Sequence, residues 1–351
     1  MKEVFAYRLK NARILRGISV QYLTEKLGVS KQMISKYEKG LSIPDGKKII
    51  TLAKIFEVKP DYFFTPATVN LSDIKFRKKA KTPKKKVESI KINILNRMEN
   101  YLFIEGILGV KTLFINPLQD YKINDIKEVE DLALHLRQEW NIGDDPVSNV
   151  ISLLETNEIK VIEINDDIQN SFDGMSTFVN DSFPAVVINE NYGVERKRFT
   201  LLHELGHLLL NIDEKFSDKE QEHICDRFAG AFLLPKHILL KEVGVKRAKI
   251  SLNELINFQK QFGISISAIM YRLAANNIIP ESRIKTFYIR QSTDAHFKQL
   301  VNRERFLNDE KSNRYQRLVY KALSQELISI SKASSLLNTD IKTIRERLTI
   351  I

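Results

Sequence analysis

Apolar residues in the first 64 positions recur at the spacing of short helices. Phe5, Leu9 and Ala12 are three or four positions apart, and Leu23 and Leu27 repeat that spacing. Apolar side chains at such intervals share one face of a helix. The pattern is interrupted at turn-forming residues, which are Gly17, Gly28, Gly40 and Pro44. We therefore predict a run of short helices that pack on one another.

A second pattern begins near Ser89 and mixes two periodicities. Helical spacing of apolar residues predicts helices over 126–140, 150–154, 194–211, 219–234 and 251–276. Runs rich in β-branched residues predict strands over 159–164 and 184–189, with a further strand near 178–179. This region is expected to be α+β, with a small sheet beside several helices.

The stretch over 66–88 has no clear periodicity and contains two prolines and eight Lys or Arg residues. It is typical of a linker or an extended basic arm. After about residue 285 the chain becomes a charged, mainly helical tail that ends in ISISKASSLLNTDIKTIRERL. We therefore expect four segments: a folded domain over 1–66, a basic linker over 67–90, a second domain over 91–285 and a tail over 286–351.

Positive charge is concentrated in the first quarter of the chain. Residues 1–88 contain 21 Lys or Arg and 8 Asp or Glu. The remaining residues contain 34 Lys or Arg and 36 Asp or Glu. A local surplus of this kind is the electrostatic footprint of a polyanion binder. The alternative is a solvated basic segment that aids solubility.

Cysteine content and hydropathy bear on the compartment. The 351 residues include one cysteine, Cys225, so a disulfide framework is not expected and a reducing cytoplasm fits better. The first residues have no apolar stretch of signal-peptide type, and no run of about 18 apolar residues occurs. We expect a cytoplasmic protein without a membrane partner.

Residues 19–40 carry the signals of two short helices joined by a tight turn. Gly28 suits the left-handed end of the first helix, and Ser30 can cap the start of the second. Such a pair, with a polar second helix, is the helix-turn-helix pattern that enters the major groove of DNA. The side chains expected to face double-stranded DNA are Lys31, Gln32, Ser35 and Lys36.

Over residues 5–65 the chain resembles the Xre-type, phage-repressor-like DNA-binding domains. The resemblance rests on LKNARILRGIS, LGVSKQMISKYEKG and ITLAKIFEVKPDYFF. It implies a five-helix domain, and domains of this type commonly read two half-sites as homodimers. Val20 stands where the family often has Gln, and Met33 where it prefers a small polar residue. The resemblance therefore does not carry a base preference over to this chain.

Residues 198–210, RFTLLHELGHLLL, carry candidate metal chemistry. His203 and His207 are four positions apart, so both imidazoles lie on one face of a helix and can reach one zinc ion. Glu204 can act as general base on the metal-bound water. A catalytic zinc needs a third protein ligand, and the nearest downstream candidates are Glu220, Glu222 and His223.

Residues 220–235, EQEHICDRFAGAFLLP, are similar to the helix that follows the zinc motif in ImmA/IrrE-type metallopeptidases. The resemblance covers about residues 130–280 and includes LRQEWNIGDDPVSNVISLLE, PAVVIN and SISAIMYRL. It implies a zincin-like fold in which Glu222 is the third zinc ligand. It places Cys225 at a small buried position and Asp226 at an Asn/Asp position, from which a carboxylate can orient a ligand imidazole.

The expected reaction is the hydrolysis of a peptide bond, with Glu204 moving the proton from water to the leaving amine. Tyr271 or His223 is expected to help stabilise the oxyanion, and the sequence does not choose between them. A peptide substrate is expected to add as a strand along a sheet edge near 184–189.

Two functions are compatible with this sequence. In the first, a zinc endopeptidase cleaves a repressor- or antitoxin-like protein, and the DNA-binding domain places it at an operator. In the second, the chain is a non-enzymatic repressor or antitoxin whose zinc region is a sensor or a partner-binding module. The presence of both Glu204 and Glu222 favours the enzyme. Apolar residues in the tail, such as Phe297 and Val301, indicate either a dimer contact or packing against the peptidase domain.

Overall fold

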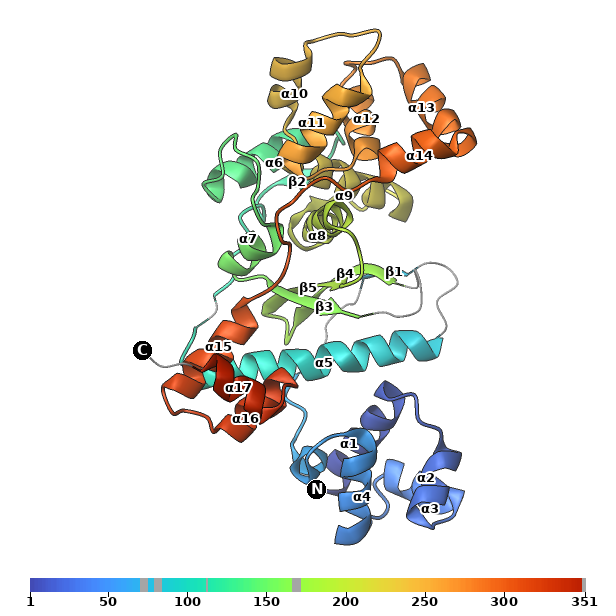
Figure 1. The fold of residues 1–351 in the computed structure, drawn as a ribbon, viewed down its shortest axis with the longest axis vertical. Coiled ribbons are helices and arrows are strands. Elements are labelled where there is room, and N and C mark those ends of the chain that lie inside the picture. Colours follow the sequence, from blue (N-terminus) through green and yellow to red (C-terminus); the bar gives the residue numbers. More distant parts are fainter. Residues whose placement is uncertain (70–74, 79–83, 112, 166–171, 349–351) are drawn as a thin grey trace. The chain divides into compact units, whose positions relative to one another are not determined.

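The structure is a computed structural model that describes residues 1–69, 75–78, 84–111, 113–165 and 172–348. The chain forms two compact units (Figure 1). The first, here called the terminal unit, comprises residues 1–71, 80–110 and 321–351. The second, the central unit, comprises residues 72–79 and 111–320. The described residues contain no helix that is long and apolar enough to cross a membrane.

The terminal unit begins with five short helices, of which the last is a 3-10 helix. They are α1 (Lys2–Leu15), α2 (Val20–Leu27), α3 (Lys31–Glu38), α4 (Gly46–Phe56) and η1 (Pro60–Phe64). Their shared core contains Phe5, Leu9, Leu23, Ile34 and Phe56, each almost fully buried. The predicted five-helix N-terminal domain is confirmed, and its apolar spacing is the reason that these helices pack together.

A long helix, α5 (Lys84–Ile107), follows these five helices. Arg8 on α1 joins them to α5, because its guanidinium donates to Glu99 Oε2 at 2.7 Å and to the Thr65 carbonyl at 2.8 Å. The terminal unit is completed by α16 (Ile330–Leu337), α17 (Ile341–Arg347) and the end of α15 (Arg314–Ser324). The two compact units thus have other bounds than the predicted segments, which end at 66, 90 and 285. Whether those segments are separable domains stays a prediction.

The central unit contains a four-stranded sheet. Its strands lie in the order β1 (Lys75–Lys78), β4 (Phe172–Val179), β5 (Phe183–Asn189) and β3 (Lys160–Ile164). β3 is parallel to β5, and the other neighbours are antiparallel. The predicted strands over 159–164 and 184–189 are confirmed. The expected edge position of 184–189 is wrong, because β5 has a hydrogen-bonded neighbour on each side. Addition of a substrate strand at an edge of the sheet stays a prediction.

Two helices pack on this sheet: α8 (Val194–Leu209) contacts β4 and β5, and a second helix, α7 (Val150–Thr156), contacts β3. α9 (Asp218–Leu233) lies against α8 on the side away from the sheet (Figure 1). A short parallel pair, β2 (Lys122–Ile123) and β6 (Asn211–Ile212), adjoins the end of α8. The remaining helices are α6 (Glu128–Glu139), α10 (Lys236–Val243), α11 (Leu252–Phe262), α12 (Ile266–Ala275), α13 (Glu281–Thr293) and α14 (Ala295–Asn302). The mostly helical α+β prediction is confirmed.

One predicted helix is divided in two. The sequence pattern predicts a single helix over 251–276, but α11 ends where Gly263 adopts φ +60°, and α12 begins after the N-cap Ser265. Glycine tolerates this left-handed conformation, which ends helices. Apolar spacing alone misses the break, because Phe262, Ile264 and Ile266 are all buried.

Much of the predicted tail belongs to the core of the central unit. Phe297 and Val301 on α14 are buried in the same apolar cluster as the residues around α8 and α9. Glu310 is fully buried and accepts a hydrogen bond at 2.8 Å from Arg198 Nη1 on α8. Arg198 also donates to the Val147 carbonyl at 2.7 Å. Packing within the chain therefore explains these apolar residues, and the homodimer remains untested.

We predict that Glu310→Ala lowers the free energy of unfolding by about 3–5 kcal/mol, because it leaves the Arg198 charge buried without its partner. Denaturant unfolding followed by circular dichroism measures this change. The matched control is Asp309→Ala, since Asp309 pairs with Lys311 at 3.6 Å while both side chains are largely exposed. The control should change stability by about 0.5 kcal/mol at most. Equal effects of the two substitutions would contradict the role given to the buried pair.

Candidate metal centre and nucleic-acid interface

Two helices that cross at close range build the candidate metal centre. α8 carries His203 and His207 one turn apart, and α9 begins with a capping box between Ser217 and Glu220. A Cβ atom placed on Gly206 would lie 3.2 Å from Cys225 Sγ on α9, which is tighter than most side-chain contacts. The absence of a side chain at Gly206 therefore lets α9 approach, and this approach brings Glu222 above the two histidines.

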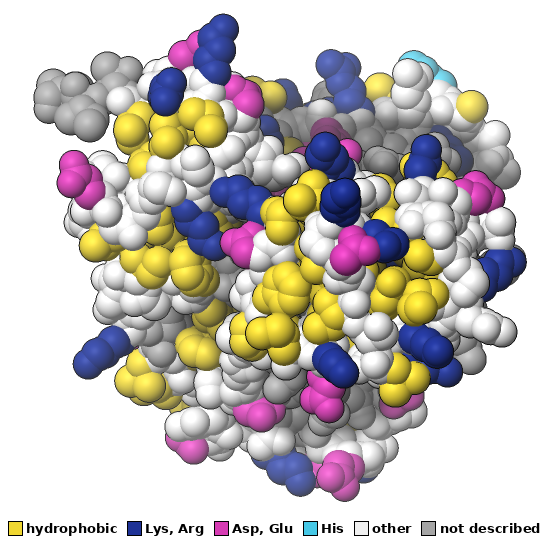
Figure 2. Space-filling model, turned by 90° about the horizontal axis from the view of Figure 1, so that it is seen from below, with side chains coloured by type: hydrophobic (Ala, Val, Ile, Leu, Met, Phe, Trp, Pro, Cys, Tyr) yellow, Lys and Arg dark blue, Asp and Glu magenta, His cyan; other side chains and the backbone are white. Residues whose placement is uncertain are grey.

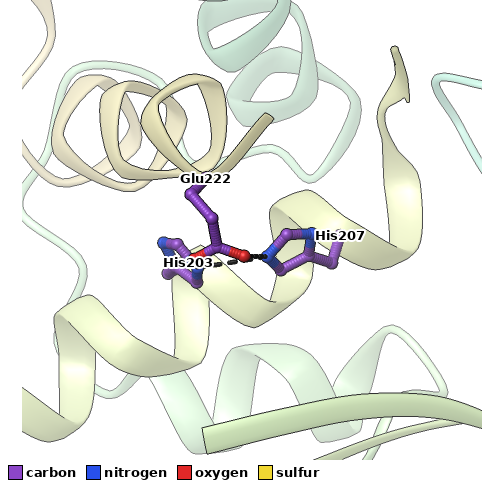
Figure 3. A group of neighbouring side chains, drawn as sticks. All are labelled: His203, His207 and Glu222. Carbon is purple, nitrogen blue, oxygen red and sulfur yellow. Dashed lines mark hydrogen bonds and ion pairs between the residues drawn. The ribbon is translucent and has the colours of Figure 1, made fainter. Parts of the chain in front are cut away.

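The side chains of His203, His207 and Glu222 point toward one another (Figure 3). Glu222 Oε2 lies 3.4 Å from His203 Nε2, and Glu222 Oε1 lies 3.2 Å from His207 Nε2. The two Nε2 atoms are 3.2 Å apart. The two histidines and Glu222, which the sequence predicts as metal ligands, thus lie together.

The chemistry of these donors fits a divalent metal. Two imidazole nitrogens and one carboxylate oxygen, all within 4.8 Å of one another, form the donor set of His₂Glu zinc sites. Hydrogen bonds from His203 and then His207 hold the pKa of Glu222 well below its usual range, so its carboxylate is ionised at neutral pH. Glu222 is half-buried whereas His203 is fully buried, so the group is open on the Glu222 side.

The other ring nitrogens of the two histidines also have neighbours. Asp226 Oδ1 lies 2.7 Å from His203 Nδ1, and Cys225 Sγ lies 3.5 Å from His207 Nδ1. A carboxylate at the far nitrogen fixes the orientation of an imidazole and leaves Nε2 available to a metal. Cys225 is buried in the crossing of α8 and α9, as the resemblance implied.

Glu204 is fully buried on the side of α8 that faces the sheet. Ser176 Oγ on β4 donates a hydrogen bond to Glu204 Oε2 at 3.0 Å. A Cβ atom placed on Gly174 would lie 2.9 Å from Glu204 Oε1, so β4 passes very close to this carboxylate. Sequence reasoning missed Ser176 and Gly174, because only the packing of β4 on α8 brings them to Glu204.

The helix-turn-helix segment has the caps that its sequence predicts. Ser19 Oγ accepts from the Tyr22 amide at 3.1 Å, and Ser30 Oγ accepts from the Met33 amide at 3.2 Å. Between the helices Gly28 adopts φ +63°. Ile34 and Tyr37 on α3 are buried, while the four residues predicted to face DNA are exposed: Lys31, Gln32, Ser35 and Lys36.

Positive charge on the face viewed in Figure 2 is spread rather than gathered in one patch. Lys and Arg side chains lie across this face, interspersed with acidic side chains and with hydrophobic ones that gather toward its centre.

Residues 9–63 match the helix-turn-helix family, and residues 156–274 match the peptidase family M78, described as the IrrE N-terminal-like domain. The chain is also similar to an SPbeta prophage-derived, uncharacterized HTH-type transcriptional regulator, YonR, of Bacillus subtilis (strain 168). The two are 36% identical over 73 residues, which are 20% of this chain and 68% of YonR. The chain belongs to the Xre-type helix-turn-helix family and carries an IrrE-type M78 domain.

The M78 match spans both helices of the metal centre, and two other ligand candidates have different contacts within it. Glu220 Oε2 accepts from the Ser217 amide at 2.9 Å, so Glu220 serves as a helix cap. His223 Nε2 lies 2.6 Å from the Tyr271 hydroxyl. Of the three downstream candidates, Glu222 is the one that meets the two histidines.

A cavity of about 1110 Å³ adjoins the metal centre of the M78 domain. Its lining includes His223 and Asp226 from α9, together with Tyr271, Arg196 and Asp173. Burial raises the pKa of the Tyr271 hydroxyl, so it keeps its proton at neutral pH. The cavity therefore reaches the candidate metal centre through Asp226, which contacts His203, and has a protonated hydroxyl at its wall.

We predict that Asp226→Asn weakens divalent-metal binding by about 10–100-fold, because it weakens the contact that orients His203. Competition with a chromogenic chelator measures the affinity of the full chain. Asp218→Asn is the control, since Asp218 is an exposed carboxylate on the same helix. Asp218→Asn should leave the affinity within about twofold of the parent. If Asp226→Asn also leaves it unchanged, Asp226 does not orient His203.

Proposed function

We propose that this HTH-type regulator with an M78 domain binds double-stranded DNA and hydrolyses a specific repressor- or antitoxin-like protein with a zinc ion held by His203, His207 and Glu222. The observation that carries the proposal is the convergence of two imidazoles and a carboxylate at α8, the helix that also carries the buried Glu204. A purely structural histidine pair requires neither a third donor nor an acidic residue at the second position of the motif.

The roles of the residues follow from their contacts. A bound zinc ion supplies a Lewis acid that polarises the scissile carbonyl and lowers the pKa of water to about 7. Glu204 accepts the proton of the attacking water and delivers it to the leaving amine. Ser176 donates to Glu204 Oε2, which orients the carboxylate. Asp226 holds the His203 ring in place.

The cavity beside the metal centre supplies the substrate site in this proposal. The Tyr271 hydroxyl and His223 contact one another at its wall. Either of them can donate a hydrogen bond to the oxyanion that develops from the scissile carbonyl.

DNA binding in this proposal depends on the exposed face of α3. Gln32 has the donor and acceptor needed to read adenine, whereas Lys31 and Lys36 can reach phosphates or guanine. Fusion of this domain to an M78 domain brings the peptidase to an operator, where a bound repressor is a nearby substrate.

Two substitutions separate metal binding from catalysis. We predict that Glu204→Gln keeps zinc while hydrolysis falls by about 10²–10⁴-fold, because every ligand remains and only the base is lost. Glu222→Ala removes a ligand, so it should lower both zinc content and hydrolysis. Zinc is measured by elemental analysis of the purified chain. Hydrolysis is measured by comparing intact proteins in cells that express the parent or Glu204→Gln.

Glu242→Gln is the matched control, since Glu242 is exposed on α10. It should keep both zinc and hydrolysis. Loss of zinc in Glu204→Gln together with retention in Glu222→Ala would show that the assigned roles are wrong. If Glu204→Gln regulates transcription as well as the parent and no protein persists in its presence, the chain is a non-enzymatic regulator.

A third substitution tests base reading. We predict that Gln32→Ala reduces discrimination by about 1–3 kcal/mol at one base pair, with a smaller effect on binding to random duplexes. Selection from a randomised duplex pool, followed by sequencing, measures the preference of the parent and of the variant. Gln138→Ala on α6 is the control, since Gln138 is exposed outside the DNA-binding helices. Identical preferences for the parent and Gln32→Ala would remove Gln32 from base reading.

A further inference from the structure

The helix pair α16–α17 repeats the backbone plan of α2–α3. α16 has eight residues, as α2 does, and Ser329 accepts a hydrogen bond from the Lys332 amide as its N-cap. α16 ends at Asn338, which adopts φ +48° where Gly28 adopts φ +63°. Asparagine is the residue that most readily replaces glycine in this left-handed conformation. The two first helices therefore begin and end in the same way.

The second helices match as well. Asp340 accepts from the Thr343 amide and caps α17, as Ser30 caps α3. Asp340 follows Ser329 by the same number of residues as Ser30 follows Ser19. The turn between the two helices thus has the same length and a left-handed residue at the same position in both pairs, so the second helix leaves the turn in a similar direction.

One buried position on each helix coincides between the two pairs. Ala333 and Ile344 have no exposed surface, and they occupy the places of Leu23 and Ile34, which are also fully buried. In each pair one position on the first helix and one on the second anchor the two helices to the core. The opposite side of the second helix is exposed to solvent in both pairs.

Another pair in the chain has similar caps but cannot serve as a DNA reader. α11 and α12 are joined through Gly263 and the N-cap Ser265. None of the ten residues of α12, all of them described, is exposed. Cap geometry alone therefore does not make a DNA-binding surface. The second helix must also be exposed if it is to contact DNA.

α17 meets this condition and is basic. Lys342, Arg345 and Arg347 are exposed. Residues 314–348 contain seven Lys or Arg and three Asp or Glu. Residues 89–351 as a whole contain 34 Lys or Arg and 36 Asp or Glu. The surplus is thus local to this segment. Exposed cations on the outward helix of such a pair are complementary to a polyanion.

We propose that α16 and α17 form a second helix-turn-helix that contacts the phosphate backbone of duplex DNA. Lys342 and Arg345 stand at the positions of Gln32 and Ser35, and Arg347 follows near the end of α17. Their chemistry favours phosphates over base edges, because Ile341 and Glu346 occupy the other two reading positions. This second motif adds affinity without sequence preference, whereas α3 supplies the preference.

The test uses the full chain with Lys342→Gln/Arg345→Gln/Arg347→Gln, because glutamine preserves helix propensity while it removes charge. Fluorescence anisotropy on a random duplex gives the affinity over a range of salt concentrations. Two or three lost phosphate contacts should reduce the slope of log affinity against log salt by about 2–3. Affinity at about 0.1 M salt should fall at least tenfold, and the preference found by duplex selection should stay the same.

The matched control removes the same charge elsewhere with Lys241→Gln/Lys246→Gln/Lys249→Gln, three exposed lysines of the central unit. It should leave the slope within about 0.5 of the parent. Circular dichroism and thermal unfolding check that both variants are folded. Should the triple variant misfold, the single variant Lys342→Gln is used, with an expected change in slope of about 1.

Three results would overturn the proposal. The first is an unchanged salt slope and affinity in the folded triple variant. The second is an equal loss in the lysine control, which would show a general effect of net charge. The third is a changed oligomeric state by sedimentation with intact DNA binding, which would make this face a protein-docking surface. Failure of the Gln32→Ala test affects sequence preference alone, so the two proposals fail separately.

Discussion

The close crossing of α8 and α9 at Gly206 is the constraint on which the candidate metal centre depends. The histidines are placed by the periodicity of one helix, but Glu222 comes from another helix and reaches them only if the two backbones approach. A side chain at position 206 would meet Cys225 at 3.2 Å, so glycine sets this distance. On the opposite face of α8, Gly174 lets β4 approach Glu204 in the same manner. Two glycines therefore allow the close approach of α9 on one side of α8 and of β4 on the other.

Local features of the sequence predicted most of the helices and the site residues on them. The caps at Ser30 and Gly28, the spacing of His203 and His207 and the β-branched runs of β3 and β5 all depend on neighbours within a few residues. Glu222 was selected from three downstream candidates through a family resemblance, and its position beside both histidines agrees with that choice.

Contacts between distant parts of the chain could not be predicted in this way. Ser176 and Glu204 are 28 residues apart, and Arg198 and Glu310 are 112 residues apart. The internal position of β5 in the sheet likewise depends on strand order, which alternation of apolar residues does not determine. The break at Gly263 and the turn at Asn338 differ from these cases. Both have a turn residue followed two positions later by a capping residue, so a search for the spacing of Gly28 and Ser30 would find them.

The terminal unit is assembled from both ends of the described chain, and this has a consequence for folding during synthesis. Lys59 Nζ donates to the Ser331 carbonyl at 3.2 Å across 272 residues, and Lys332 lies over the ring of Phe103. A ribosome adds about 5–20 residues per second, so these contacts form many seconds after the first five helices have emerged. The early helices have their own core and can fold at once. A nascent chain can therefore fold its first helix-turn-helix before α16 and α17 exist, so the terminal unit is complete only after translation has passed the M78 domain.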